Sequence, residues 1–130
     1  MQIVFLIGRI IFGLFWLSSG WNHLSKIEYM SQYAKAKGTP APKLAVGGTG
    51  VLLTLAGLSL LLGIFPYVGI ALLIVFLLGV SFKMHDFWND TDPQMRQINQ
   101  INFMKNLALL GALLMLLLLP LPWSMSVPLG

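Results

Sequence analysis

The 130-residue sequence contains no cysteine and few charged side chains. The absence of cysteine excludes disulfides, thiolate nucleophiles, cysteine-ligated zinc, iron–sulfur clusters and CxxC redox chemistry within this chain. Charged residues make up 9% of the sequence, whereas soluble domains carry about 25%. So few charged side chains provide too little polar surface to cover a globular protein in water. The composition, with 57% hydrophobic residues, therefore predicts a protein that lies mostly within a membrane.

Motifs of soluble enzymes are also missing. The sequence has no phosphate-binding glycine loop, no nucleophile elbow and no zinc-binding HExxH. The run Gly47–Gly50 lies inside an apolar segment, so it is not a nucleotide loop. The formal net charge of +4 does not indicate a nucleic-acid partner, because the basic residues flank apolar segments, where they set topology and meet anionic lipids. We expect membrane lipids as partners, no nucleic acid and no metal site.

Four apolar segments are long enough to cross a membrane, which takes about 20 residues for about 30 Å of hydrocarbon. The predicted spans cover residues 2–22, 43–65, 67–88 and 98–119. Pro66 leaves room for only a short turn, so the second and third spans should be antiparallel neighbours. The spans use most of the chain. We therefore expect one membrane domain over residues 1–130, an all-α up-down bundle of four transmembrane helices.

A different pattern follows the first span, in residues 24–37. Leu24, Ile27, Met30 and Tyr33 recur at helical spacing, while lysine, glutamate and glutamine fill the other face. This alternation is typical of an amphipathic helix that lies along the membrane surface. The segment Gly38–Pro42 should end it. The sequence thus predicts an interfacial helix between the first and second spans.

The basic residues are distributed unevenly across the predicted topology. Arg9 alone lies toward the side that carries both termini, and the other seven lysines and arginines belong to the opposite side or its flanks. The positive-inside rule then places the two longer loops in the cytoplasm and both termini outside.

Polar side chains interrupt the apolar segments, and Arg9 is the clearest case. A charge at that depth costs about 3 kcal/mol on insertion scales, so it normally faces protein or a wet cavity. The ends of the first and third spans and the start of the fourth should meet at one membrane face. The polar residues that gather there are His23, Lys83, His85, Asp86, Asn102, Lys105 and Asn106. Arg9 approaches this candidate site from the opposite end.

Each of these groups has a functional and a structural interpretation. Arg9 could contact an anion or a quinone carbonyl, or it could be a structural charge bonded to carbonyls of a neighbouring helix. Asp86 should form an ion pair with Lys83 or Lys105, which we favour over a proton relay. Two histidines near helix ends, His23 and His85, are not enough to indicate a haem site, and we do not expect haem. A quinone head group is a candidate ligand of this site. The asparagines Asn99, Asn102 and Asn106 more often hold helices together than bind ligands.

Small residues form a stripe on the second span at Gly47, Gly50, Thr54 and Gly57, and Gly13 and Gly20 lie on the Arg9 stripe of the first span. Small side chains allow a second helix to approach closely. This packing could serve the core of the bundle or a second copy of the chain.

The chain resembles the DoxX family of small four-helix membrane proteins. The likeness is carried by Gly8–Gly13 with Ser19-Gly20, by His85–Trp88, and by Phe103–Gly111. The resemblance implies a prokaryotic inner-membrane protein that works with membrane redox systems, such as thiosulfate:quinone oxidoreductase, a terminal oxidase, or a complex with superoxide dismutase and a sulfurtransferase. More distant relatives resemble membrane chaperones or cargo receptors. Redox roles of the family that involve thiols do not fit this chain, which has none.

The function expected from this resemblance is an accessory subunit of a respiratory or sulfur-linked redox complex that faces a quinone. In that case Arg9 and Lys105 would hold an anionic or carbonyl group, and His85 would handle a proton. The alternative is a non-enzymatic subunit or chaperone-like scaffold that assembles or stabilises a complex. A small transporter is a weaker third class, because four short spans make a narrow pathway. We expect a homo-oligomer or membership of a larger membrane complex.

Overall fold

A computed structural model describes residues 1–127 of the chain, and these residues are helical with no strand among them. The elements are α1 (Gln2–Ser25), α2 (Ile27–Ala36), α3 (Pro42–Leu62), α4 (Pro66–Met84), the short 3-10 helix η1 (Phe87–Asn89) and α5 (Pro93–Leu117). Four of them, α1, α3, α4 and α5, are long and apolar enough to cross a membrane. The all-α class with four spans is confirmed.

Local chemistry sets where the helices begin and end. Proline stands at the start of α3, α4 and α5, where its missing N–H costs no hydrogen bond. Gly63, with φ of 73°, ends α3 in the left-handed conformation that glycine adopts readily. Asp92 caps α5 by accepting from the Met95 N–H at 3.4 Å. The helix therefore begins ahead of the span predicted from hydropathy, which started at Ile98.

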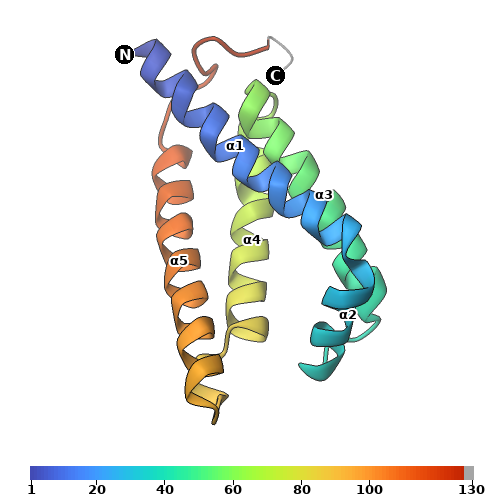
Figure 1. Cartoon of the computed structure of the whole chain (residues 1–130). Coiled ribbons are helices and arrows are strands. Elements are labelled where there is room, and N and C mark those ends of the chain that lie inside the picture. Colours follow the sequence, from blue (N-terminus) through green and yellow to red (C-terminus); the bar gives the residue numbers. More distant parts are fainter. Residues whose placement is uncertain (128–130) are drawn as a thin grey trace.

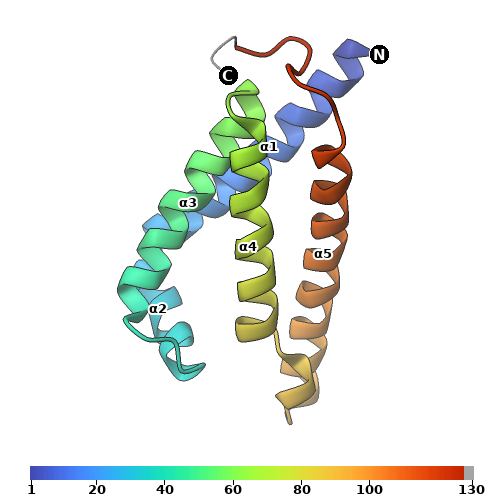
Figure 2. The same cartoon turned by 180° about the vertical axis from the view of Figure 1, so that it is seen from behind.

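The helices form two pairs that diverge from a common end. α1 packs along α3, and α4 packs along α5, while the turn before Pro66 joins the pairs as antiparallel neighbours. Figures 1 and 2 show that the pairs lie close together at the end where α1 begins and α5 ends, and that they separate toward the end where α2 lies. α2 packs on α3 and touches the last turn of α4 through Tyr33, whose hydroxyl donates to the Met84 carbonyl at 2.9 Å.

The contact between α1 and α3 depends on facing glycines. A Cβ atom at Gly20 would lie 3.0 Å from the Gly50 carbonyl oxygen, and one at Gly57 would lie 3.2 Å from the Gly13 carbonyl oxygen. Thr54 faces Gly20 as well. These short distances leave no room for side chains at Gly20 and Gly57, so the backbones of α1 and α3 approach closely. A Cβ atom at Gly47 would make only ordinary contact, 3.7 Å from a methyl group of Ile27 on α2.

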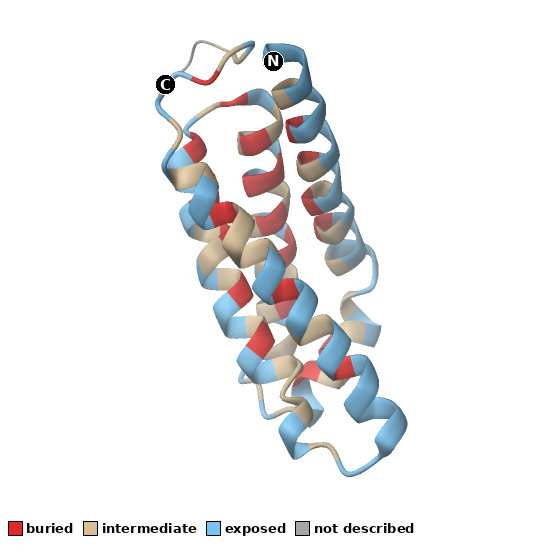
Figure 3. Ribbon diagram, turned by 90° about the vertical axis from the view of Figure 1, so that its left-hand side faces the viewer, coloured by how far each residue is buried: buried red, intermediate tan, exposed pale blue. Residues whose placement is uncertain are grey.

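The core lies along the inner faces of the helices, as Figure 3 shows in red. Its fully buried members include Trp16, Leu53, Leu60, Leu73 and Leu113. The outward faces carry many exposed leucine, isoleucine, valine and methionine side chains. Apolar residues on the outside are what a hydrocarbon environment requires of a spanning helix.

The chain after α5 folds back over the common end of the helices. Leu119 accepts a hydrogen bond from the Tyr67 hydroxyl at 2.9 Å, and the Val127 N–H donates to the Leu62 carbonyl at 2.9 Å. Trp123 is 4% exposed and meets Phe5 edge to face. This C-terminal segment, residues 118–127, therefore covers the end of α3 and part of α1.

Candidate functional site

Arg9 lies buried where α1 meets the end of α3, and it is 5% exposed. Its guanidinium donates to the carbonyls of Leu60 at 3.2 Å and Leu61 at 2.9 Å in the last turn of α3. It also donates to Ser124 at 2.7 Å and Met125 at 3.5 Å in the C-terminal segment. Because the last carbonyls of a helix have no intrahelical partner, Arg9 satisfies two of them while it holds the C-terminal segment in place.

Aromatic rings complete the surroundings of this charge. The guanidinium carbon of Arg9 lies 5.7 Å from the ring centres of both Phe5 and Trp123. Such contacts attract a desolvated cation to the faces of the rings. Of the two interpretations that the sequence left open for Arg9, the geometry matches the structural charge bonded to backbone carbonyls.

A second polar cluster lies at the opposite end, where α4 leads into α5. Asn99 is 3% exposed, and its amide oxygen is 3.1 Å from Nδ1 of His85. The amide nitrogen of Asn99 donates to the carboxylate of Asp90 at 2.7 Å and to the hydroxyl of Tyr33 at 3.5 Å. One buried asparagine of α5 thus joins the end of α4, the following loop and α2.

An ion pair ties the same place to α2. The ammonium of Lys37 lies 2.6 Å from Asp86, and the amide of Asn89 donates to the other oxygen of that carboxylate at 3.0 Å. Burial alone would lower the pKa of Lys37, but the hydrogen bond to Asp86 and the nearby Tyr33 and Asp90 raise it overall. We call the set the polar junction; its members are Tyr33, Lys37, His85, Asp86, Asn89, Asp90 and Asn99.

The polar junction contains residues that the sequence did not place there. The predicted ion-pair partners of Asp86, Lys83 and Lys105, were wrong, because Asp86 pairs with Lys37 instead. Tyr33 and Lys37 were assigned to opposite faces of a surface helix. Their spacing of four residues was a usable signal, because it places Lys37, the residue directly after α2, on the same side of the helix as Tyr33.

The remaining candidates on α5 lie deeper than the polar junction. The Lys105 ammonium is 5.9 Å from the ring centre of Phe15 on α1, and Asn102 is half-buried. Asn106 is 6% exposed, and no hydrogen bond within residues 1–127 involves its amide. The indole N–H of the buried Trp16 also lacks a partner among those residues.

His23 lies apart from the hydrogen bonds of the polar junction. Its Nδ1 is 2.8 Å from the Ser19 carbonyl in its own helix, and its ring meets Phe76 edge to face at 6.1 Å. Within the described part of the chain, no group of three histidine, aspartate or glutamate side chains is placed to hold a metal ion. The structure thus brings His85 and Asp86 together and leaves His23 and Arg9 elsewhere.

We expect Asn99→Leu to loosen the polar junction. The substitution leaves His85, Asp90 and Tyr33 each without one partner, and an unsatisfied buried polar group costs about 1–3 kcal/mol. The midpoint of thermal unfolding should fall, and amide exchange in α2 should speed up. Gln100→Leu is the matched control because Gln100 is exposed on the next position. Unchanged exchange in α2 would show that the junction does not hold that helix.

Comparison with known proteins identifies the family of the chain. The DoxX family model matches residues 4–86, a stretch that includes Arg9, His85 and Asp86 and ends before α5. The chain is 31% identical over 114 residues to the inner membrane protein YphA of Escherichia coli (strain K12), covering 88% of this chain and 81% of that protein. No solved structure matches the chain. With four apolar helices and a match over more than half its length, this multi-pass membrane protein belongs to the DoxX family.

Proposed function

We propose that this chain is an accessory subunit of a respiratory or sulfur-linked redox complex in a prokaryotic inner membrane, where it assembles or stabilises the complex rather than carrying out its chemistry. The family resemblance supports the redox setting, and the name of the E. coli relative supports the inner membrane. The bias of basic residues supports an orientation with both termini outside. In this proposal α2 lies at the cytoplasmic membrane surface.

The observation that carries the proposal is the exposure of α5. Among the four spans, α5 has the lowest mean hydropathy and buries the smallest share of its residues. It packs on α4 and η1, and Figure 3 colours much of the bundle's outer surface as exposed. α5 is thus the span that its own chain covers least, which leaves the most helix surface open to another helix. A protein partner on α5 would cover this surface.

The partner would meet a defined strip of α5. Ile101, Met104 and Met115 are exposed, and they lie on one helical face with Ala108 and Gly111. A Cβ atom at Gly111 would have open space around it. We call these five residues the α5 strip. Its small centre would admit another helix at close range.

The engagement of the buried polar groups within the chain also favours an assembly role. A catalytic site needs polar groups that converge on a space for substrate. Arg9 instead contacts four backbone carbonyls, and His85 and Asp86 contact Asn99 and Lys37. The cavity beside α2 and the cavity over the turn between α3 and α4 are not lined by these side chains.

One observation favours a second candidate function, the binding of a quinone head group. The buried indole N–H of Trp16 has no partner within residues 1–127, Asn106 is buried on α5, and the exposed ammonium of Lys105 lies 5.9 Å from the ring centre of Phe15 on α1. Quinone carbonyls accept such hydrogen bonds, and the surrounding rings fit an apolar ring. In this case Asn106 and Lys105 would orient the carbonyl oxygens.

The assembly proposal predicts that a bulky side chain on the α5 strip releases the partner. Met104→Trp should lower the amount of complex that copurifies with the tagged chain by about ten-fold, because overpacking one helix contact typically costs 1–3 kcal/mol. Val75→Trp is the control, since Val75 is exposed on α4. The measurement is partner recovery on native gels, and equal recovery from both variants would overturn the proposal.

The two functions separate in the variant Asn106→Leu. An assembly subunit should keep normal turnover per assembled complex, since Asn106 lies off the α5 strip. If the complex forms in normal amount while its quinone-linked turnover collapses, the quinone function stands and the assembly function is insufficient. His85→Leu tests the two functions in the same way at the polar junction, by the amount of complex formed and by its quinone-linked turnover.

A further inference from the structure

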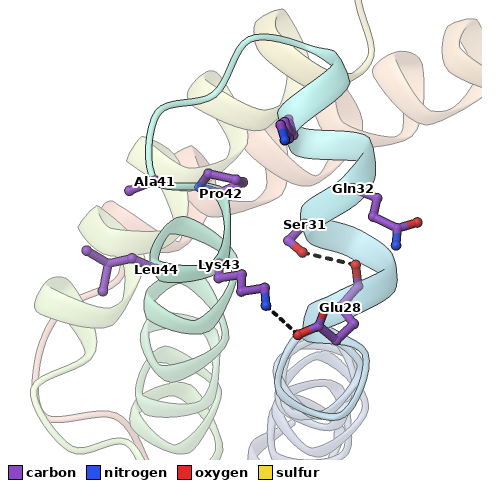
Figure 4. Close-up of a pocket in the computed structure, with 8 residues that line it drawn as sticks. Glu28, Ser31, Gln32, Ala41, Pro42, Lys43 and Leu44 are labelled. Carbon is purple, nitrogen blue, oxygen red and sulfur yellow. Dashed lines mark hydrogen bonds and ion pairs between the residues drawn. The ribbon is translucent and has the colours of Figure 1, made fainter.

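A cavity of about 490 Å³ opens between α2 and the beginning of α3. Figure 4 shows Lys43 and Glu28 reaching toward each other across it, with Ser31 beside them. The side chains that line it come from both elements: Glu28, Ser31, Gln32, Lys35, Ala41, Pro42, Lys43 and Leu44. This cavity lies outside the polar junction and the α5 strip.

The position of the cavity in the fold fixes its depth in the membrane. α1 and α3 both have the length and hydropathy of membrane spans, so the segment that joins them must emerge at one membrane face. The cavity lies where α3 begins, at the level of that face. Trp21 and Tyr29, which are 70% and 76% exposed, lie in the neighbouring turns. Exposed tryptophan and tyrosine are typical of the head-group layer.

The charges around the cavity favour an anion. Lys35 and Lys43 line it against the single carboxylate of Glu28. The pair between Lys43 and Glu28 measures 2.7 Å, but both side chains are largely exposed, so the pair is weak and can exchange. In addition, the first N–H groups of α3 have no side-chain cap. Glu28 is the only acidic residue among those that line the cavity.

The uncharged wall of the cavity favours an amphiphile over a simple ion. Ala41, Pro42 and Leu44 supply apolar surface next to the two lysines. A phospholipid brings a phosphodiester for the lysines and a glycerol and acyl region for that wall. The acyl chains would continue into the bilayer beside α3.

From these observations we propose that the cavity between α2 and α3 binds the head group of an anionic phospholipid. Lys43 exchanges Glu28 for the phosphodiester, and Lys35 supplies the second positive charge. The proposal is independent of the redox setting and of the partner on α5. Inorganic phosphate shares the anion chemistry, so the experiment must separate a lipid from a soluble ion.

The test measures lipids retained by the full-length protein. The purified chain is placed in mixed micelles with equal amounts of phosphatidylglycerol and phosphatidylcholine, and the lipids bound after delipidation are counted by native mass spectrometry. The wild-type chain should retain phosphatidylglycerol preferentially. The variant K35Q/K43Q should lose that preference by about ten-fold or more, since each lysine near an anionic lipid contributes about a five-fold factor. Glu28→Gln should strengthen the retention.

The matched control is K26Q/R96Q, which removes the same charge from exposed residues at the same end of the molecule but outside the cavity. All four substituted residues are exposed, so the fold should survive in both variants. Equal losses in the two double variants would overturn the proposal in favour of general surface charge. Displacement of phosphatidylglycerol by millimolar inorganic phosphate would overturn it in favour of a soluble anion.

Discussion

Arg9→Met should strongly destabilise the fold. The change removes donors from Leu60 and Leu61 at the end of α3 and from Ser124 and Met125 in the C-terminal segment. Hydrogen bonds to charged groups contribute about 1.5–3 kcal/mol each, and loss of the buried charge offsets part of this. We expect a net loss of about 3 kcal/mol, measured as thermal unfolding in detergent.

The C-terminal segment provides a second, more specific measurement. Trp123 is buried and in contact with both Phe5 and Arg9, so its release should expose it to chymotrypsin. In Arg9→Met we expect cleavage near Trp123 at much lower protease concentration than in the wild type. Arg9→Lys should be intermediate, because an ammonium keeps the charge but lacks the planar fork of donors. Arg96→Met, at an exposed position, is the control.

If Arg9→Met kept its unfolding midpoint and its protease resistance, Arg9 would not be the clamp between α3 and the C-terminal segment. A normal midpoint together with lost redox turnover of the complex would point instead to a ligand contact for Arg9. The two measurements therefore separate the structural interpretation of this buried charge from the functional one.

Gly20→Leu should separate α1 from α3. A Cβ atom at Gly20 already meets Thr54 Oγ1 and lies 3.0 Å from both the Gly50 carbonyl oxygen and the Thr54 nitrogen. Two of these atoms belong to the backbone and cannot move aside without displacing the helix. Overpacking typically costs 1–3 kcal/mol, and we expect a loss of about 3 kcal/mol or more here because the obstacle is backbone. Thermal unfolding and the yield of folded protein measure it.

Gly8→Leu is the control for this prediction within the same helix. No atom lies within 4 Å of a Cβ atom at Gly8, which faces outward. Leucine is also the better helix former by about 0.8 kcal/mol, so this variant should be neutral or slightly more stable. Equal behaviour of the two variants would mean that α1 and α3 do not depend on close backbone contact.

The outcome of both predictions bears on the family as a whole. The match to the DoxX family covers Arg9, Gly13, Gly20 and the glycines of α3. If these residues hold α1 against α3, then the matched region describes a packing unit rather than a reaction centre. In that case the α5 strip of the proposed function would be the surface to test next.

The sequence determined the architecture because hydropathy acts over whole segments. Runs of about 20 apolar residues can satisfy their backbone within lipid only as helices, so the four spans followed from composition and length. Proline and glycine marked where these segments begin and end, and the short turn at Pro66 required α3 and α4 to be antiparallel neighbours. The small residues on the first two spans also predicted a close helix contact, because only small side chains allow two helix backbones to approach closely.

The tertiary structure alone decided which polar groups meet. The amphipathic pattern put Tyr33 and Lys37 on opposite faces, whereas in the structure Tyr33 contacts Met84 and Lys37 contacts Asp86 at the end of α4. Likewise, nothing in the sequence placed the carbonyls of Ser124 and Met125 beside Arg9, because their contact spans more than a hundred residues. Hydrogen bonds act over about 3 Å, so their partners are fixed by how helices pack and where loops return. Periodicity specifies a face, and only packing specifies what lies opposite it.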